Sequence, residues 1–303
     1  MTRRAFVQHA SIVAGATALA PACRRSAAMD PAPRFPMGYQ LYSVRDAMAA
    51  DALGTVRALL DMGYVHFEAY GYDAAADTLY GLAPKRLRRE LDALGTAVTS
   101  AHFGFADYLH EPADALRRYT DACLSCAEAL DLRYLVWPII RAADRTPEGF
   151  RQLARQLNVV GERVRGAGRG FAFHNNGGEF VDLGDGTTGY DIVLAETDPT
   201  LVELELDMYW LAHDRAGLTP AELIAREPGR FRLWHVKDMH PVSRDYTELG
   251  AGTLDYRSLL PSPERSGLEL VYLEQGGNFA VDSMTSAAVN AEHWQRRLAR
   301  RVG

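Results

Sequence analysis

The chain has few cysteines, no long hydrophobic run and no excess of basic residues. Its 33 Lys and Arg are outnumbered by 39 Asp and Glu and are scattered, which argues against nucleic acid as a partner because phosphate binding requires a basic face. Of three cysteines, Cys123 and Cys126 form C-x-x-C within a helical stretch. No second Cys or His pair nearby would complete a zinc site, so we interpret both as small core residues.

The first 23 residues, MTRRAFVQHASIVAGATALAPAC, differ from the rest of the chain. Arg3 and Arg4 precede a modestly apolar stretch that is shorter than the ~20 residues of a membrane span. The segment resembles a bacterial twin-arginine export signal, which predicts a periplasmic location and no transmembrane span in the mature protein. Cys23 is a candidate acceptor for a lipid anchor, and an amphipathic first helix is the alternative interpretation.

A Pro- and Ala-rich tether is expected at 24–36, and the pattern then becomes regular from 37 to 303. Eight short apolar runs alternate with longer amphipathic stretches, several of which end at a glycine suited to a helix C-cap. The predicted strands are 37–43, 64–70, 97–103, 133–138, 170–175, 201–209, 230–238 and 268–275. Helical segments between them include 51–63, 84–95 and 148–168.

Eight strand–helix units predict a single (β/α)8 TIM barrel, an α/β fold whose usual size is ~250 residues. An open, doubly wound sheet is the competing fold. That fold usually has a Gly-rich phosphate turn after its first strand, and the sequence QLYSVRD offers none. The sequence therefore favours the barrel, without a second domain.

Polar residues stand near the predicted carboxyl ends of the strands, where TIM barrels carry their active sites. In chain order they are Tyr42, Glu68, His102, Trp137, His174, Asp207, His235 with Lys237, and Glu274. Asp207, His235 and Glu274 combine carboxylate and imidazole, which suits one Mn²⁺, Mg²⁺, Co²⁺ or Zn²⁺ ion. For the fourth ligand we favour His174, at its strand end, over Glu179 in the following loop.

Seven segments carry a family resemblance: MGYQLYSVRDAM, MGYVHFEAYGY, FHNNGGEF, ELDMYWL, WHVKDM, ELGAGTLDY and VYLEQGGN. From residue 37 onward the chain resembles the sugar phosphate isomerase/epimerase family with the xylose isomerase-like TIM barrel. The resemblance implies one divalent metal held by Glu, Asp, His and Glu at the ends of strands five to eight. Asp207, His235 and Glu274 match three of these positions, whereas His174 stands where the family has its first Glu. This departure removes one of the two carboxylates that transfer protons in the family's epimerases.

A sugar that binds such a metal through a carbonyl oxygen and a hydroxyl would form an enediolate more readily. Glu274 is the candidate general base, and Lys237 and His174 are the other candidate catalytic residues. Glu205 faces the same side as Asp207 and is expected to pair with Lys237 or to bind substrate. The other candidate substrate-binding residues are Glu68, His102, Trp137 and Trp210. The glycines of 248–256 predict a tight turn, with phosphate binding there as a further hypothesis.

The predicted function is a metal-dependent isomerase or epimerase that acts on a non-phosphorylated sugar or keto-sugar, since sugar phosphates are mainly cytoplasmic. A metal-dependent lyase or hydratase that cleaves keto-glycosides by β-elimination is the alternative. A non-catalytic sugar-binding barrel is a third interpretation, and the intact metal set argues against it. A homo-oligomer is left open.

Overall fold

The computed structural model describes residues 35–215 and 217–302. The expected export signal, including Cys23, and all but the last two residues of the expected tether lie outside the described residues. Phe35 is 7% exposed and belongs to the hydrophobic core. Packing therefore begins two residues before the predicted start of the barrel.

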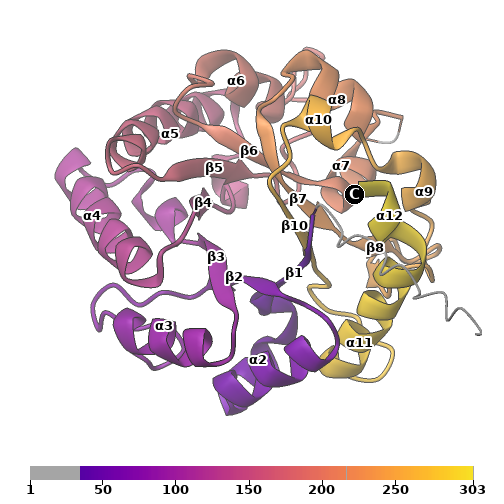
Figure 1. Cartoon of the computed structure of the whole chain (residues 1–303). Helices are drawn as coiled ribbons and strands as arrows, with labels where there is room; N and C mark the ends of the chain where they lie inside the picture. The colour runs from indigo at the N-terminus through magenta and orange to yellow at the C-terminus, as the bar shows by residue number, and fades with distance from the viewer. Residues whose placement is uncertain (1–34, 216, 303) are drawn as a thin grey trace, which may run out of the picture. The chain divides into compact units, whose positions relative to one another are not determined.

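Eight parallel strands close into a barrel, which confirms the predicted TIM barrel and excludes the open sheet (Figure 1). Around the barrel the order is β1-β10-β7-β6-β5-β4-β3-β2. All eight predicted strands are present: β1 (Met37–Gln40), β2 (His66–Tyr70), β3 (Ala97–His102), β4 (Tyr134–Trp137), β5 (Gly170–His174), β6 (Glu203–Asp207), β7 (Phe231–Val236) and β10 (Leu270–Leu273). Two further short strands, β8 (Asp238–Met239) and β9 (Tyr246–Thr247), pair with each other in antiparallel fashion.

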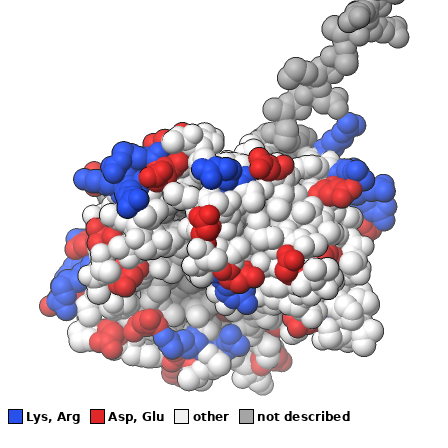
Figure 2. Space-filling view, turned by 90° about the horizontal axis from the view of Figure 1, so that it is seen from below, with Lys and Arg blue, Asp and Glu red and all other residues white. Residues whose placement is uncertain are grey.

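Helices follow the strands and surround the barrel (Figure 1). They are α1 (Arg45–Ala50), α2 (Ala52–Asp61), α3 (Pro84–Ala93), α4 (Ala113–Leu130), α5 (Pro147–Gly166), α6 (Gly189–Glu196), α7 (Met208–Asp214), α8 (Pro220–Arg226), α9 (Tyr256–Leu259), α10 (Pro263–Ser266), α11 (Ser283–His293) and α12 (Ala299–Val302). Within the described ranges, none of these helices combines the length and apolar character that a membrane crossing requires. On the face in Figure 2, basic and acidic side chains are intermixed.

Local sequence signals explain how several helices start, end and pack. Thr188 and the aspartate three residues later form a reciprocal capping box at the start of α6. Gly95 and Gly168, just beyond α3 and α5, adopt φ angles of 71° and 74°, as expected for C-cap glycines. Cys123 and Cys126 lie in α4 at 0% and 1% exposure, and burial raises the pKa of Cys126 to about 12, so the pair packs as an unreactive part of the core.

Alternation along the strands decides which residues enter the barrel. The inward positions of several strands form a small apolar cluster of their own: Tyr134, Val136, Ala172, Leu233, Leu270 and Tyr272. Trp137 follows an inward residue and therefore points outward, where it is 0% exposed and stacks on Phe105 with ring centroids 5.4 Å apart. Trp137, a candidate substrate-binding residue from the sequence, therefore packs beneath the helices rather than in the barrel interior.

Gly38 in β1 offers a test of interior packing. A Cβ added there would lie 2.6 Å from the Val271 carbonyl oxygen and 2.7 Å from Cδ1 of Tyr272. Since a packed interior leaves these neighbours little room to move, Gly38→Ala should lower the free energy of unfolding by ~1–3 kcal/mol in urea denaturation. The exposed Gly166→Ala, in the last turn of α5 with no atom within 4 Å of its added Cβ, is the control and should leave the free energy of unfolding unchanged or raise it by up to ~1 kcal/mol. Equal stabilities for the two variants would contradict this packing.

Candidate metal centre

Four predicted ligand residues meet at the carboxyl ends of neighbouring strands. His174 ends β5, Asp207 ends β6, His235 lies in β7, and Glu274 directly follows β10. One ligand atom of each lies within 4.8 Å of the others. Parallel strands of a barrel end at the same rim, so these distant segments of sequence are brought together there. We call these four residues the ligand group.

Four buried atoms crowd the centre of the ligand group: His174 Nε2, Asp207 Oδ2, His235 Nδ1 and Glu274 Oε2. His235 Nδ1 lies 2.6 Å from Glu274 Oε2, whereas His174 Nε2 is 3.5 Å from Asp207 Oδ2 and makes no hydrogen bond among the described residues. His174 Nδ1 lies 2.8 Å from the Pro138 carbonyl oxygen and must donate to it, which leaves a lone pair on Nε2. Buried polar atoms are nearly always satisfied, so the free Nε2 of His174, which faces two buried carboxylates, indicates a ligand.

Negative charge is in excess at this end of the barrel. The carboxylates of Glu68, Glu205, Asp207 and Glu274 belong to residues no more than 9% exposed. In the part of the chain that the structure describes, Lys237 is the only lysine or arginine paired with any of them: its Nζ lies 2.6 Å from Asp207 Oδ2 and 2.9 Å from Glu274 Oε2. Uncompensated buried charge is costly, so the site favours a further cation.

The ligand group fits a divalent metal ion. Metal–ligand distances for imidazole and carboxylate are ~2.0–2.2 Å, so atoms this close together can share one ion. Burial lowers the pKa of His174, which keeps its imidazole neutral as a ligand must be. Burial alone would raise the pKa of Glu274, but Lys237 and His235 outweigh it and hold that pKa below its ordinary value. Glu274 is therefore a carboxylate.

Asp207 uses its two oxygens for different tasks. Oδ1 accepts hydrogen bonds from the amides of Tyr209 at 3.0 Å and Trp210 at 3.1 Å, and so caps the start of α7. Oδ2 faces the ligand group. The Asn175 side chain holds the Asp207 backbone by accepting from its amide at 3.1 Å and donating to its carbonyl at 3.0 Å. The strand-to-helix turn thus fixes the direction of the carboxylate.

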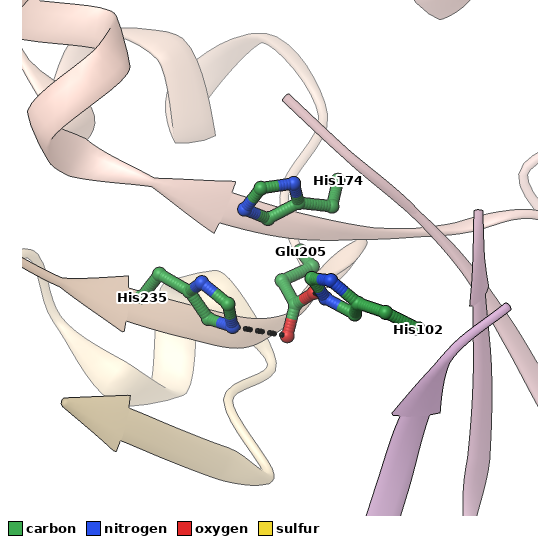
Figure 3. Close-up of side chains that lie close together, drawn as sticks. All are labelled: His102, His174, Glu205 and His235. Atoms are coloured by element: carbon green, nitrogen blue, oxygen red, sulfur yellow. Dashed lines mark hydrogen bonds and ion pairs between the residues drawn. The ribbon is translucent and has the colours of Figure 1, made fainter. Parts of the chain in front are cut away.

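A ring of ion pairs lies deeper in the barrel than the ligand group. Glu205 precedes Asp207 by two residues in β6, so its side chain occupies the next inward position below that of Asp207. His102 Nε2 lies 3.0 Å from Glu68 Oε2 and 2.8 Å from Glu205 Oε2. His235 Nε2 lies 2.6 Å from Glu68 Oε2 and 3.1 Å from Glu205 Oε1. Figure 3 shows the side chains of His102, His235 and Glu205 gathered beside that of His174. We call Glu68, His102, Glu205 and His235 the histidine–carboxylate ring.

The ring contradicts the expected pairing of Glu205 with Lys237. Glu205 pairs with the two histidines rather than with Lys237, whose partners are Asp207 and Glu274. Glu68 and Glu205, the candidate substrate-binding carboxylates, are both 0% exposed and bind the histidines of the ring. The side chain of His102 is 13% exposed.

Sequence reasoning missed the residues that support the ring. Gln40 Nε2 donates to Glu68 Oε2 at 2.7 Å, and the Ser100 hydroxyl donates to Glu68 Oε1. Ser100 also lies 3.0 Å from the Tyr272 hydroxyl. Gln40 pairs with Glu68 in strand register, and Ser100 precedes His102 by two residues, so both occupy inward positions. Strand alternation is the sequence signal that would have identified them.

The two remaining candidates lie around the ligand group. Glu179, the alternative fourth ligand, is not part of the ligand group. Its Oε2 accepts a hydrogen bond from the Gly177 amide at 2.6 Å, and burial raises the pKa of the Glu179 carboxyl to about 7. Trp210, in α7, packs against Tyr209 and Tyr246 with ring centroids 4.9 Å and 6.1 Å apart. The buried Trp210 Nε1 has no hydrogen-bond partner among the described residues.

The glycine-rich loop at 248–256 folds around the carboxylate of Asp238. Asp238 Oδ2 accepts from the amides of Gly250 at 2.9 Å and Gly252 at 3.2 Å, and Oδ1 accepts from the Leu254 amide at 3.0 Å. A Cβ on Gly252 would collide with this carboxylate, which explains the glycine. The amides that a phosphate would need are therefore already bound to an anionic group.

Comparison with other proteins places the chain in a family. A family profile described as xylose isomerase-like TIM barrel matches residues 56–269, so the chain belongs to that family. No functionally curated sequence matches it.

Several solved structures share the fold. A sugar phosphate isomerase/epimerase from Parabacteroides distasonis is similar with a TM-score of 0.77 and 22% identity, over 92% of this chain and 99% of that one. The IOLI protein, solved with a zinc atom, has a TM-score of 0.64 and 13% identity over 89% and 99% of the two chains. A xylose isomerase-like TIM barrel protein from Mycobacterium smegmatis, in complex with magnesium, has a TM-score of 0.60 and 18% identity over 89% and 98%.

The histidine–carboxylate ring predicts a pH-dependent stability. Burial alone would lower the pKa of His102, but Glu68 and Glu205 raise it from 6.5 to about 9. The charged imidazole therefore stabilises the fold fully below pH 6.5, and this contribution is lost as the pH rises through 9. In chelator-treated protein, the free energy of unfolding in urea should fall across this interval, and less steeply in His102→Gln. Parallel profiles for the wild type and this variant would contradict the ring, and the exposed His110→Gln serves as a control.

Proposed function

We propose that the protein is a divalent-metal-dependent isomerase or epimerase that removes a proton next to the carbonyl of a non-phosphorylated sugar. The observation that carries this proposal is the meeting of four buried ligand atoms from β5, β6, β7 and the end of β10, within 4.8 Å of one another. Membership of the xylose isomerase-like family supports a small sugar as substrate.

Each residue has a role that follows from its position. A divalent cation held by the ligand group would polarise the substrate carbonyl and make the neighbouring C–H more acidic. Glu274 is the candidate base, because it is ionised and, at 9%, is the most exposed of the four. Lys237, held between Asp207 and Glu274, provides a fixed positive charge where negative charge would develop on a substrate oxygen.

The surroundings of the ligand group favour an unphosphorylated sugar. Trp210, Tyr209 and Tyr246 form an aromatic group beside it, and aromatic rings stack well on the apolar face of a sugar. The amides of Gly250 and Gly252 donate to the Asp238 carboxylate and are therefore not free to bind a phosphate group. The segment 1–23, which resembles an export signal, supports a periplasmic location, and Cys23 supports a lipid anchor.

A lyase that cleaves keto-glycosides by β-elimination is the second candidate. His174 stands in place of a carboxylate and spends both nitrogens, one on Pro138 and one on the ligand group. A symmetric exchange between two ligand carboxylates is therefore not available, whereas an elimination needs only one ligand base. Both reactions begin with the same proton removal.

Deuterium exchange tests this shared first step. The manganese-loaded protein, incubated in D₂O with a panel of keto-sugars and keto-glycosides, should incorporate deuterium beside the carbonyl of at least one. Glu274→Gln should lower that rate by ~10²-fold or more, because it removes the base. Chelation of the metal should abolish exchange, and added Mn²⁺ should restore it.

The controls separate an enzyme from a sugar-binding barrel. Exposed His110→Gln should exchange at the wild-type rate. Sugar affinity that survives in Glu274→Gln while exchange is lost would support catalysis. Sugar binding by the wild type without exchange for any member of the panel would indicate the non-catalytic barrel, and exchange that is insensitive to chelation would exclude the metal.

A further inference from the structure

We propose that a cavity at the amino end of the barrel binds a phosphate group. The cavity has a volume of about 640 Å³, and its lining includes residues at the starts of β4, β5, β6, β7 and β10, which are neighbours in the barrel. It lies at the opposite end from the ligand group, so the inference goes beyond the proposed function. Five arginines that are far apart in the sequence line it: Arg133, Arg165, Arg169, Arg230 and Arg232.

Two of these arginines are held by the protein itself. Arg230 is 4% exposed, and its Nε donates to the Val202 carbonyl oxygen at 2.9 Å. Arg169 Nη1 lies 2.9 Å from Oδ1 of Asp131, an acid outside the lining of the cavity. We therefore assign these two side chains a structural role.

The other three arginines share two carboxylates. Arg133 and Arg232 both pair with Glu269, Arg232 at 3.5 Å. Arg165 Nη1 lies 3.7 Å from Glu203 Oε1, which is longer than a hydrogen bond. The buried Nε of Arg232 has no hydrogen-bond partner among the described residues. Positive charge is therefore in excess here, and N–H donors remain for an anion.

An irregularity in the barrel places Arg232 at this cavity. Leu204 of β6 pairs with Phe231 of β7, but the next residue, Glu205, pairs with Leu233, so Arg232 is the extra residue of a β-bulge. Bulges change the direction of a side chain and are frequent beside functional sites. Regular alternation would not have predicted this position for Arg232.

A belt of ion pairs that only stabilises the barrel is the competing explanation, because the amino end of a TIM barrel usually serves stability. Such a belt would match each guanidinium with a carboxylate and leave no buried donor free. Here three guanidinium groups share two carboxylates, and one buried donor has no partner among the described residues. The observed pairing favours a bound anion.

The chemistry of the cavity suits a phosphate group. Guanidinium groups bind phosphate oxygens through pairs of parallel hydrogen bonds. The volume falls within the ~300–1,000 Å³ of small-molecule sites, so the phosphate group can carry an organic part. A free phosphate compound and a phospholipid headgroup are the two sources. β1 begins at this same end of the barrel, so a lipid anchor at Cys23 would attach to the barrel from this side.

Inorganic pyrophosphate is the probe for the site. Titration calorimetry on the full chain, in buffer free of divalent metal ions, should detect binding that weakens as NaCl is added. Arg165→Gln and Arg232→Gln should each lower the affinity by ~10-fold or more, because each removes a charged hydrogen bond. The Arg165 side chain is 57% exposed, so its replacement should leave the fold intact. Arg86→Gln, with a side chain 62% exposed in α3, is the matched control and should bind as the wild type does.

Vesicles distinguish the two sources of the phosphate group. Cosedimentation with phosphatidylglycerol vesicles, stronger than with phosphatidylcholine vesicles and reduced in Arg165→Gln, would identify a lipid headgroup. Pyrophosphate binding without such arginine-dependent cosedimentation would identify a free phosphate compound.

Two results would overturn the inference. One is the absence of pyrophosphate binding together with equal vesicle binding by the wild type and Arg165→Gln. The other is pyrophosphate binding that survives in both arginine variants and is lost in Lys237→Gln, because the anion would then lie at the ligand group.

Discussion

Four buried carboxylates at one end of the barrel, with one lysine to offset their charge, determine which groups can surround them. Glu68, Glu205, Asp207 and Glu274 can share this small volume only if positive charge is supplied. Lys237 supplies one charge, and His102 and His235 supply protons to the deeper pair. The remaining demand falls on the ligand group, where a divalent cation would meet it. The proposed metal binding and proton transfer thus follow from one electrostatic constraint.

The fold meets this constraint by alternation along short strands. In β5, β6, β7 and just after β10, the inward positions near the carboxyl end are polar, while inward positions nearer the amino end, such as Ala172, Leu233 and Tyr272, form the apolar cluster beneath. The outward residues between them pack against the helices. A shift of one residue along a strand moves a side chain from the barrel interior to the layer beneath the helices, as the contrast between Val136 and Trp137 demonstrates.

The fold and the ligand group could be predicted because both depend on local order in the sequence. Strand periodicity placed all eight strands, and the rule that parallel strands end at one rim brought His174, Asp207, His235 and Glu274 together. The partner of each side chain could not be predicted in this way. Lys237 reaches Asp207 and Glu274 rather than Glu205 because the twist and stagger of the barrel, which the sequence does not display, decide which inward residues lie at the same level. The outward position of Trp137, by contrast, follows from strand alternation alone.

The most direct test is the anomalous scattering of Mn²⁺ in crystals of the protein grown with that metal. The account predicts one strong peak between His174 Nε2, Asp207 Oδ2, His235 Nδ1 and Glu274 Oε2, with the histidine–carboxylate ring free of metal. A peak held by His102, Glu205 and His235 alone, or no peak at a saturating Mn²⁺ concentration, would contradict it.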